Sequence, residues 1–313
     1  MAVLAFIGKR LAAAGLLLGF LSVLTFGLLV AAPGSPEHVL LGSRPSTPET
    51  RAAIRAEHML DEPVAVRYVH WLGKALDGDF GTSSYSREPV SSVIGQRLPV
   101  TAALAAYGVG LTLAVAVPAG LIAGLRRGSA MDQGISTAAL VATAIPPFVL
   151  GLLLLYGFAV ALGWFPVYGS GGIAHLTLPA IALASGQAAI VLRQTRAAAL
   201  DLAGQDYLTF ARARGLARSR IWISYAMRNA SLPVLTVGGL TLATYLTGAV
   251  FVERIFSLPG LGSLLIQAVG QKDIPLVQAL VLLGGAIVVA VNLLVDLAYL
   301  AVDARVRHGV IAP

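Results

Sequence analysis

The 313-residue chain is hydrophobic at 57% of its positions, and only 12% of its residues are charged. Soluble globular domains carry about 25% charged residues, so this composition argues against a water-solvated globule and indicates a protein whose solvent is lipid. The 22 Lys and Arg residues against 15 Asp and Glu give a formal net charge of +7. No cysteine is present, which excludes disulfides, thiol catalysis and cysteine-based metal sites.

Six apolar segments are long enough to cross the roughly 30 Å hydrocarbon core of a bilayer, which takes about 20 residues of helix. They cover about residues 11–32, 99–125, 134–162, 176–192, 232–252 and 276–302. The first could instead be a signal peptide, because a cleavage-like "VAA" precedes Pro33. Its apolar run exceeds the roughly 7–15 residues of a signal peptide, so an uncleaved helix is favoured. The chain is predicted to be an all-α polytopic membrane protein with six transmembrane helices.

The basic residues indicate the orientation of these helices. Six spans place both termini on one side, and that side carries most of the basic residues near the spans: Lys9, Arg10, Arg126, Arg127, Arg193, Arg196, Arg228, Arg305 and Arg307. Lys and Arg concentrate in cytoplasmic loops, so both termini and the loop 198–231, with its four further arginines at 212, 214, 218 and 220, are predicted to be cytoplasmic. The Ala-, Gly- and Arg-rich usage suggests a GC-rich genome and hence a bacterial inner or plasma membrane.

A long segment, residues 33–98, separates the first helix (1–32) from a core of five predicted helices (99–313) and is expected to be an extracytoplasmic helical insertion. One short helix is predicted to start after Thr47 or Ser46 as N-cap, with Pro48 in its first turn. A second is predicted in "VAVRYVHWLGKALDGDFGTS", residues 64–83, where a Gly/Asp turn ends it.

No motif for an enzymatic reaction is found in the sequence. It has no phosphate-binding loop, no HExxH, no GxSxG and no paired intramembrane acids of a proton relay. His58 and His70 could be metal ligands, but no acids or cysteines cluster near them, so surface or packing roles are favoured. Asp296 is expected to make a polar contact near the cytoplasmic end of the last span. Glu253 ends the fifth span, where solvent or a lumen is expected to reach it.

The chain is therefore predicted to have no catalytic residues, but it could still move a solute if another subunit supplied the energy. The candidate contact site for such a subunit is "DYLTFARARGLARSRIW", residues 206–222, a basic island within the loop 198–231. Asp206 suits a helix N-cap, and four residues then share one helical face: Tyr207, Phe210, Ala211 and Arg214. Gly215 can adopt a positive φ and end that helix. Such a helix could rest on anionic lipid or dock in a groove of a partner protein, and composition does not decide between them.

Short motifs in order along the chain distinguish these alternatives. They are APGSP (32–36), GDFGTS (78–83), IPPF (145–148), LPAIAL (178–183), TGAVFVERIFSLPGLGSLL (247–265) and DLAYLAVDARVR (296–307). The basic island adds an acid and an aromatic, then ARARG (211–215), then Leu232-Pro233. With these motifs and this topology, the chain resembles the permeases of ABC importers of the dipeptide/oligopeptide (and nickel) family. The long segment after the first span resembles that of the first permease subunit of the pair.

The resemblance implies an ABC type I importer-like fold and a set of partners. These are a second homologous permease subunit, two ATP-binding-cassette ATPase subunits or domains, an extracytoplasmic solute-binding protein and the lipid bilayer, with no nucleic acid. ATP and Mg²⁺ would bind the ATPase subunits and no cofactor would bind this chain. Peptide is the expected substrate, with nickel or another small solute as the alternative. A stand-alone secondary carrier is less favoured, because it would need charged residues inside the membrane.

The resemblance also assigns the basic island as the coupling helix that docks in a cleft of an ATPase subunit. The residues expected to dock are Asp206, Tyr207, Phe210, Ala211, Arg212, Arg214, Gly215 and Leu216. Phe210 is either a docking anchor or packed back against the permease.

A second group of residues is a candidate for the gate or the solute pathway: Pro146, Pro147, Phe148, Gly238, Gly239, Thr247, Gly248 and Glu253. Pro146 and Pro147 interrupt the backbone hydrogen bonds of the third span and could form a hinge, although proline kinks are also tolerated there. The three glycines could allow close, sliding helix contacts, or they could simply reflect how common glycine is in membrane helices.

Overall fold

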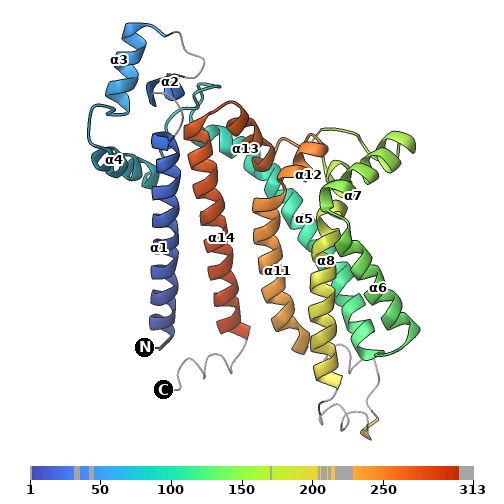
Figure 1. Ribbon diagram of the computed structural model, residues 1–313. Helices are drawn as coiled ribbons and strands as arrows, with labels where there is room; N and C mark the ends of the chain where they lie inside the picture. Colours follow the sequence, from blue (N-terminus) through green and yellow to red (C-terminus); the bar gives the residue numbers. More distant parts are fainter. Residues whose placement is uncertain are drawn as a thin grey trace. The chain divides into compact units, whose positions relative to one another are not determined.

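The computed structural model describes residues 2–31, 36–41, 46–169, 171–203, 205, 210, 213–215 and 228–302. Over these residues the chain is helical (Figure 1), and the one pairing of extended backbone is an isolated bridge between Thr82 and Pro89. The prediction of an all-α protein is therefore confirmed.

The chain divides into two compact units. The first comprises residues 3–101 and 259–289, and the second comprises residues 102–258 and the segment from 290 onward. Two long helices, α5 (Val90–Leu125) and α14 (Ile274–Val302), contribute to both units.

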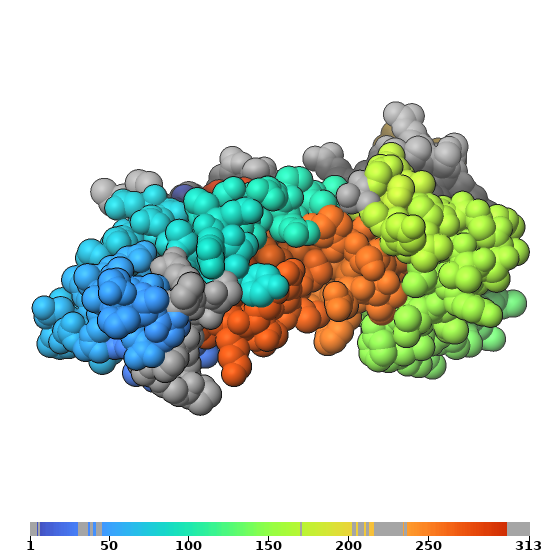
Figure 2. Space-filling view, turned by 90° about the horizontal axis from the view of Figure 1, so that it is seen from above, coloured from blue at the N-terminus to red at the C-terminus, as the bar shows by residue number. Residues whose placement is uncertain are grey.

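The first unit contains the predicted insertion. Besides parts of α5 and α14, it holds α1 (Ala2–Ala31), α2 (Pro36–Leu41), α3 (Pro48–Glu57), α4 (Val64–Leu76) and α13 (Leu261–Gly270). Thr47 caps α3 as predicted, and its hydroxyl accepts a hydrogen bond from the Thr50 amide at 3.2 Å. Gly78, with φ of +81°, lies in the Gly/Asp turn after α4. In Figure 2 the blue residues of α3 and α4 lie on the surface seen from above.

Two apolar cores hold the first unit together. Side chains of α5, α13 and α14 form the larger core: Val90, Ile94, Leu261, Leu264, Leu276, Val277 and Leu280. A smaller core joins the C-terminal end of α1 to α2 and α3 through Leu29, Leu40, Leu41 and Ile54. The insertion is thus attached to the end of a membrane-length helix by apolar burial.

A buried carboxylate fixes the start of α14. Asp273 is fully buried and accepts hydrogen bonds from the Ser83 hydroxyl, from the Ser84 amide at 3.2 Å and from the Leu276 amide at 3.4 Å. Because Leu276 lies in the first turn of α14, Asp273 acts as the helix cap. The same carboxylate therefore holds the loop after α4, which gives the serine of the GDFGTS motif a structural role.

The second unit is built around α8 (Ile173–Ala203). The helices α6 (Ala130–Ala144), α7 (Pro147–Leu154), α11 (Arg228–Gly248) and α12 (Val250–Ile255) pack against it, and α7 continues into a π-helical segment, η1 (Leu155–Ala161). Small and β-branched residues dominate its core: Ala116, Ala139, Ala189, Val191, Leu192 and Val237. Small side chains allow helix backbones to approach closely in a membrane.

Four described helices are long and apolar enough to cross a membrane: Ile7–Val30 in α1, Val90–Leu125 in α5, Ile173–Asp201 in α8 and Ile274–Ala298 in α14. The pair of α6 and α7 meets the same criteria together and makes a fifth if it forms one span. The second apolar helix begins at Val90, not at residue 99 as the sequence predicted, so Pro99 lies inside it.

The predicted third span, about residues 134–162, is broken near the prolines that the sequence singled out. The chain turns by 95° between α6 and α7, at Ile145 and Pro146. Ile145 is extended, with ψ of 117°, because the residue before a proline is pushed out of the helical region. Pro147 then begins α7, where its missing N–H leaves no hydrogen bond unmade.

The helix α11 occupies most of the predicted fifth span, 232–252. Three of its threonines, Thr241, Thr244 and Thr247, donate their hydroxyl hydrogen bonds to carbonyls four residues earlier, at 2.7 to 2.8 Å. These hydroxyls are satisfied within the helix itself, which lowers the cost of placing them in an apolar environment.

Candidate functional site

The candidate site is the basic segment that follows α8. The structure describes Phe210 and residues 213–215 of it, and these belong to the second unit. The remaining predicted docking residues lie outside the described residues: Asp206, Tyr207, Ala211, Arg212 and Leu216.

Phe210 and Arg214 form one local group. The Phe210 side chain is 64% exposed, and the Arg214 guanidinium carbon lies 5.7 Å from the centre of its ring. The Arg214 amide donates to the Phe210 carbonyl at 3.0 Å, which is one turn of helix. Over the described residues the ring is therefore mostly exposed, and its role as a docking anchor stays a prediction.

Gly215 ends this turn. Its φ is +73°, a left-handed conformation that residues with a Cβ rarely adopt, and a Cβ placed there would meet no atom within 4 Å. The constraint on this position is therefore conformational and not steric. Phe210 and Arg214 thus lie on one helical turn, and the helix ends at Gly215.

An ion pair anchors the part of α8 that leads to this segment. Arg196 donates from Nε to Asp132 Oδ1 at 2.7 Å and from Nη2 to Oδ2 at 2.9 Å, a two-point contact between α8 and the first turn of α6. The Gly128 amide also donates to Asp132 at 3.0 Å, and Ser129 caps α6. A bidentate Arg–carboxylate pair fixes the relative orientation of two elements more strictly than a single contact. The turn between α5 and α6 is thus tied to α8.

Two glycines bring α5 against the same stretch of α8. A Cβ on Gly120 would lie 2.6 Å from the Leu192 carbonyl oxygen, and a Cβ on Gly124 would lie 2.7 Å from the Arg196 carbonyl oxygen. Neither glycine was predicted from the sequence as a close-contact position. The pattern GLIAG at 120–124 is a small-xxx-small motif and could have identified them.

A buried polar contact joins further helices of the second unit. The Tyr245 hydroxyl of α11 donates to the Leu183 carbonyl of α8 at 3.0 Å and lies 2.8 Å from the Thr112 hydroxyl of α5. Tyr245 and Thr112 are both buried. Together with the Arg196 ion pair, this contact makes α8 the common partner of α5, α6 and α11.

The predicted pathway residues fall into separate groups. Pro146 and Pro147 produce the bend between α6 and α7. Phe148, in the first turn of α7, is exposed, and its ring centre lies 6.3 Å from that of Phe251 in α12, which is also exposed. The bend thus presents an aromatic pair at a surface of the second unit.

The three glycines of α11 are not equivalent. A Cβ on Gly239 would clash with the Val295 side chain of α14, a Cβ on Gly238 would make ordinary contact with Leu113, and one on Gly248 would meet only Thr244 at 4.0 Å. Close helix approach therefore applies to Gly239 and not to Gly248. Thr247 is exposed, beside Gly248 at the end of α11.

The expectation for Glu253 is wrong. Its side chain is fully buried, and its amide and carbonyl bond to Ala249 and Leu258. Neither solvent nor a lumen reaches it within the unit. The residue lies in the short helix α12, a separate element that follows the end of α11 and that the apolar pattern of the sequence does not distinguish from the span.

No group of three or more His, Asp or Glu side chains that could hold a metal ion occurs among the described residues. His58 and His70 are near one cavity of the first unit, but they do not form such a group.

The family model of binding-protein-dependent transport system inner membrane components matches residues 116–308, and the model of the N-terminal part of such components matches residues 3–105. The chain belongs to this family of transport-system membrane components.

The relatives of this permease are similar over nearly their whole length. The oligopeptide transport system permease protein AppB of Bacillus subtilis is 36% identical over 313 residues, covering 96% of this chain and 98% of that protein. A second relative, from Brucella abortus (strain 2308), is named as a peptide transport system permease protein. It is 38% identical over 312 residues, covering 97% of this chain and 99% of that protein.

A solved structure has the same fold over part of the permease. It is an inward-facing form of the MetNI methionine ABC transporter, with a TM-score of 0.56, 17% sequence identity, and coverage of 67% of this chain and 96% of that chain. At this identity the likeness concerns the fold alone. The permease thus has the fold of an ABC importer membrane subunit, and the basic segment lies within the main family match, 116–308.

Proposed function

We propose that this permease is the first of two membrane subunits of a peptide ABC importer, and that its basic segment receives the motion of an ATPase subunit. Full-length relatives named as peptide or oligopeptide permeases support the substrate class. The observation that carries the coupling role is the exposed Phe210 ring with Arg214 beside it, on a turn ended by the positive φ of Gly215. An apolar anchor beside a cation suits a protein groove with an acidic rim.

The proposal includes the assembly and its topology. Six helices cross the membrane with both termini cytoplasmic, and residues 33–98 lie outside beneath a solute-binding protein. A second homologous permease completes the pathway, and two ATPase subunits or domains bind ATP and Mg²⁺. The permease itself binds no cofactor and catalyses no reaction.

Motion would pass through the second unit in a defined order. Movement of the basic segment pulls on α8, and the Arg196–Asp132 pair conveys it to α6 and to the turn after α5. The bend at Pro146 then lets α6 and α7, which both pack against α8, change their angle to one another. Packed helices transmit such shifts as rigid bodies.

The coupling role is tested in the full complex reconstituted in liposomes. Phe210→Ala and Arg214→Glu should abolish most ATP-driven peptide uptake and the stimulation of ATPase activity by the loaded binding protein, while the amount of permease in the membrane stays unchanged. Phe20→Ala is a matched control, because Phe20 is an aromatic of similar exposure on the apolar helix α1. Normal uptake in both basic-segment variants would refute the docking role.

The substrate class is tested on the binding protein. Mass spectrometry of the ligand that it retains on purification should identify peptides. A nickel complex or another small solute in place of peptides would show that the permease transports that solute. Uptake without ATP or an ATPase would instead identify a secondary carrier.

A further inference from the structure

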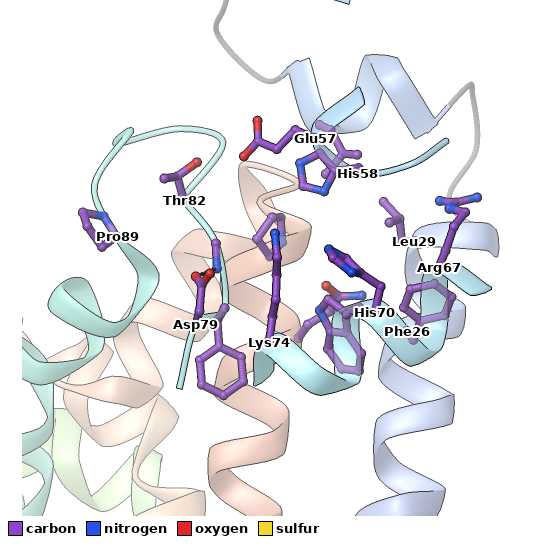
Figure 3. A pocket seen from close by; sticks show the side chains of 16 residues that line it. Phe26, Leu29, Glu57, His58, Arg67, His70, Lys74, Asp79, Thr82 and Pro89 are labelled. Carbon is purple, nitrogen blue, oxygen red and sulfur yellow. Dashed lines mark hydrogen bonds between the residues drawn. The ribbon is translucent and has the colours of Figure 1, made fainter. Parts of the chain in front are cut away.

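A cavity of about 310 Å³ lies in the first unit, next to the C-terminal end of α1 (Figure 3). Its wall comes from that end of α1, from α2, from the end of α3, from α4, from the loop 79–82 with Pro89, and from the start of α14. The coupling mechanism uses none of these residues. The volume suits a ligand group larger than a water molecule and smaller than a peptide.

Arg67 is the unusual residue of this wall. Its side chain is only 8% exposed, and its Nε and Nη2 atoms have no hydrogen-bond partner. Buried polar groups are almost always hydrogen-bonded, and an unpaired buried cation is especially unfavourable. Two carboxylates, Glu57 and Asp79, also line the cavity, but neither forms an ion pair with Arg67, and Asp79 accepts from the Gly81 amide at 2.9 Å. The guanidinium is therefore available to an anion from outside the chain.

The cationic side of α4 continues beyond Arg67. Lys74 follows two turns later, and Figure 3 shows Lys74, His70 and Arg67 in a row along the helix. The planar donor set of an arginine matches two oxygens of a phosphate, and a lysine adds a point charge nearby. This arrangement suits a phosphate group.

A second face of α4 is apolar and exposed. Val66, Val69 and Leu76 are all exposed and lie within a quarter of the helix circumference, next to the cationic side. The third face packs Tyr68 and Trp71 against Phe26 of α1, with ring centres 5.5 Å apart for each pair with Phe26. A helix with adjoining apolar and cationic faces is typical of one that lies in the membrane interface.

The cavity lies at the end of the apolar stretch of α1, which agrees with a position of α4 in the membrane interface. Phe26 lies in the last turns of the apolar stretch Ile7–Val30, so the aromatic group marks the level at which that stretch leaves the hydrocarbon. Lipid phosphates lie just beyond this level.

We propose that this cavity binds the phosphate of an anionic membrane phospholipid, with Arg67 and Lys74 holding the headgroup and the acyl chains lying along Val66, Val69 and Leu76. A soluble phosphate would satisfy Arg67 but would leave the apolar face of α4 uncovered. A phospholipid satisfies both with one molecule. The site holds the insertion at the membrane surface independently of which solute is transported.

The test uses the purified complex in nanodiscs of phosphatidylcholine with increasing fractions of phosphatidylglycerol, and native mass spectrometry counts the lipids retained on release. The wild type should retain phosphatidylglycerol in preference to phosphatidylcholine. Arg67→Gln should weaken this preference about tenfold, the change expected when one charge-assisted contact is lost. Arg51→Gln is the matched control, because Arg51 is an exposed arginine of the same insertion that bonds to Ser46.

Two further arms keep the proposal falsifiable. Lys74→Gln changes an exposed side chain and should weaken retention without altering the melting temperature, even if Arg67→Gln fails to fold. Inorganic phosphate and glycerol 3-phosphate should not displace the retained lipid. Equal retention of both lipids by the wild type, displacement by the soluble phosphates, or displacement of lipid by the solute-binding protein would each overturn the assignment.

Discussion

Replacing Gly120 with alanine should force α5 and α8 apart. The new Cβ would lie 2.6 Å from the Leu192 carbonyl oxygen, 2.8 Å from Thr195 Cβ and 3.1 Å from the Arg196 amide nitrogen. Ordinary contact begins at 3.4 Å, so the two backbones must separate by 3.4 − 2.6 = 0.8 Å along that direction. Two of the three nearest atoms belong to the backbone of α8, so no rotation of a side chain can relieve the contact.

The expected cost follows from this geometry. Overpacking of a tight core costs about 1–3 kcal/mol, whereas alanine in place of glycine within a helix contributes roughly 0.5–1 kcal/mol in the opposite direction. The net loss in the free energy of unfolding should be about 1–2 kcal/mol. Coupling should also suffer, because the separation occurs beside Arg196, whose ion pair holds α8 to α6.

Thermal unfolding of the permease in nanodiscs, followed by intrinsic fluorescence, measures the effect. Gly110→Ala is the matched control, since Gly110 lies in the same helix and a Cβ there meets no atom within 4 Å. The control should be as stable as the wild type or slightly more so. A Gly120→Ala variant that melts with the control would refute the close approach of α5 and α8.

Three more outcomes are expected. Ser83→Ala should destabilise the permease by about 1.5–3 kcal/mol in chemical unfolding, because the change removes a hydrogen-bond donor to the buried Asp273 carboxylate. The same Ser83→Ala change should cost much less when Asp273→Asn is already present, because the two residues share one interaction. Arg196→Lys should reduce transport-coupled ATPase activity by removing the two-point contact, and Asp132→Asn should add little to it; additive losses would show that the two residues act separately. Tyr245→Phe should lower stability by about 0.6 kcal/mol and by no more than roughly 1.7 kcal/mol, the range measured for hydrogen bonds between membrane helices, and an unchanged melting temperature would contradict a structural role for this hydroxyl.

The sequence predicts the helices better than it predicts their limits. Apolar runs of about 20 residues identify the long helices because burial in lipid depends on composition. The start of α5 at Val90 was missed because its first residues, "VSSVIGQRL", are too polar to count as span although they are helical. The bend after α6 was foreseen as a possible hinge at Pro146 and Pro147, but its 95° angle depends on packing against α8.

In the candidate site, too, local features could be predicted from the sequence and tertiary contacts could not. The positive φ of Gly215 follows from the residue type within a helix-ending pattern, and the sequence suggested it. The Asp132–Arg196 pair joins residues 64 positions apart, and Ser83–Asp273 joins residues 190 apart. Such pairs are chosen by tertiary packing, and no local pattern indicates which charge meets which. Glu253 was misplaced for a similar reason, because burial of one carboxylate depends on the elements that surround it.

The threonine row of α11 bears on how the chain enters the membrane. Helices reach the bilayer one after another during synthesis, and a polar side chain that waits for a partner on a later helix is a liability at that stage. Thr241, Thr244 and Thr247 carry their partners with them, on the preceding turn of the same helix. In the proposed six-span topology, α11 can therefore partition into lipid before α14 has been made, and its tight contact at Gly239 can form afterwards as a separate step.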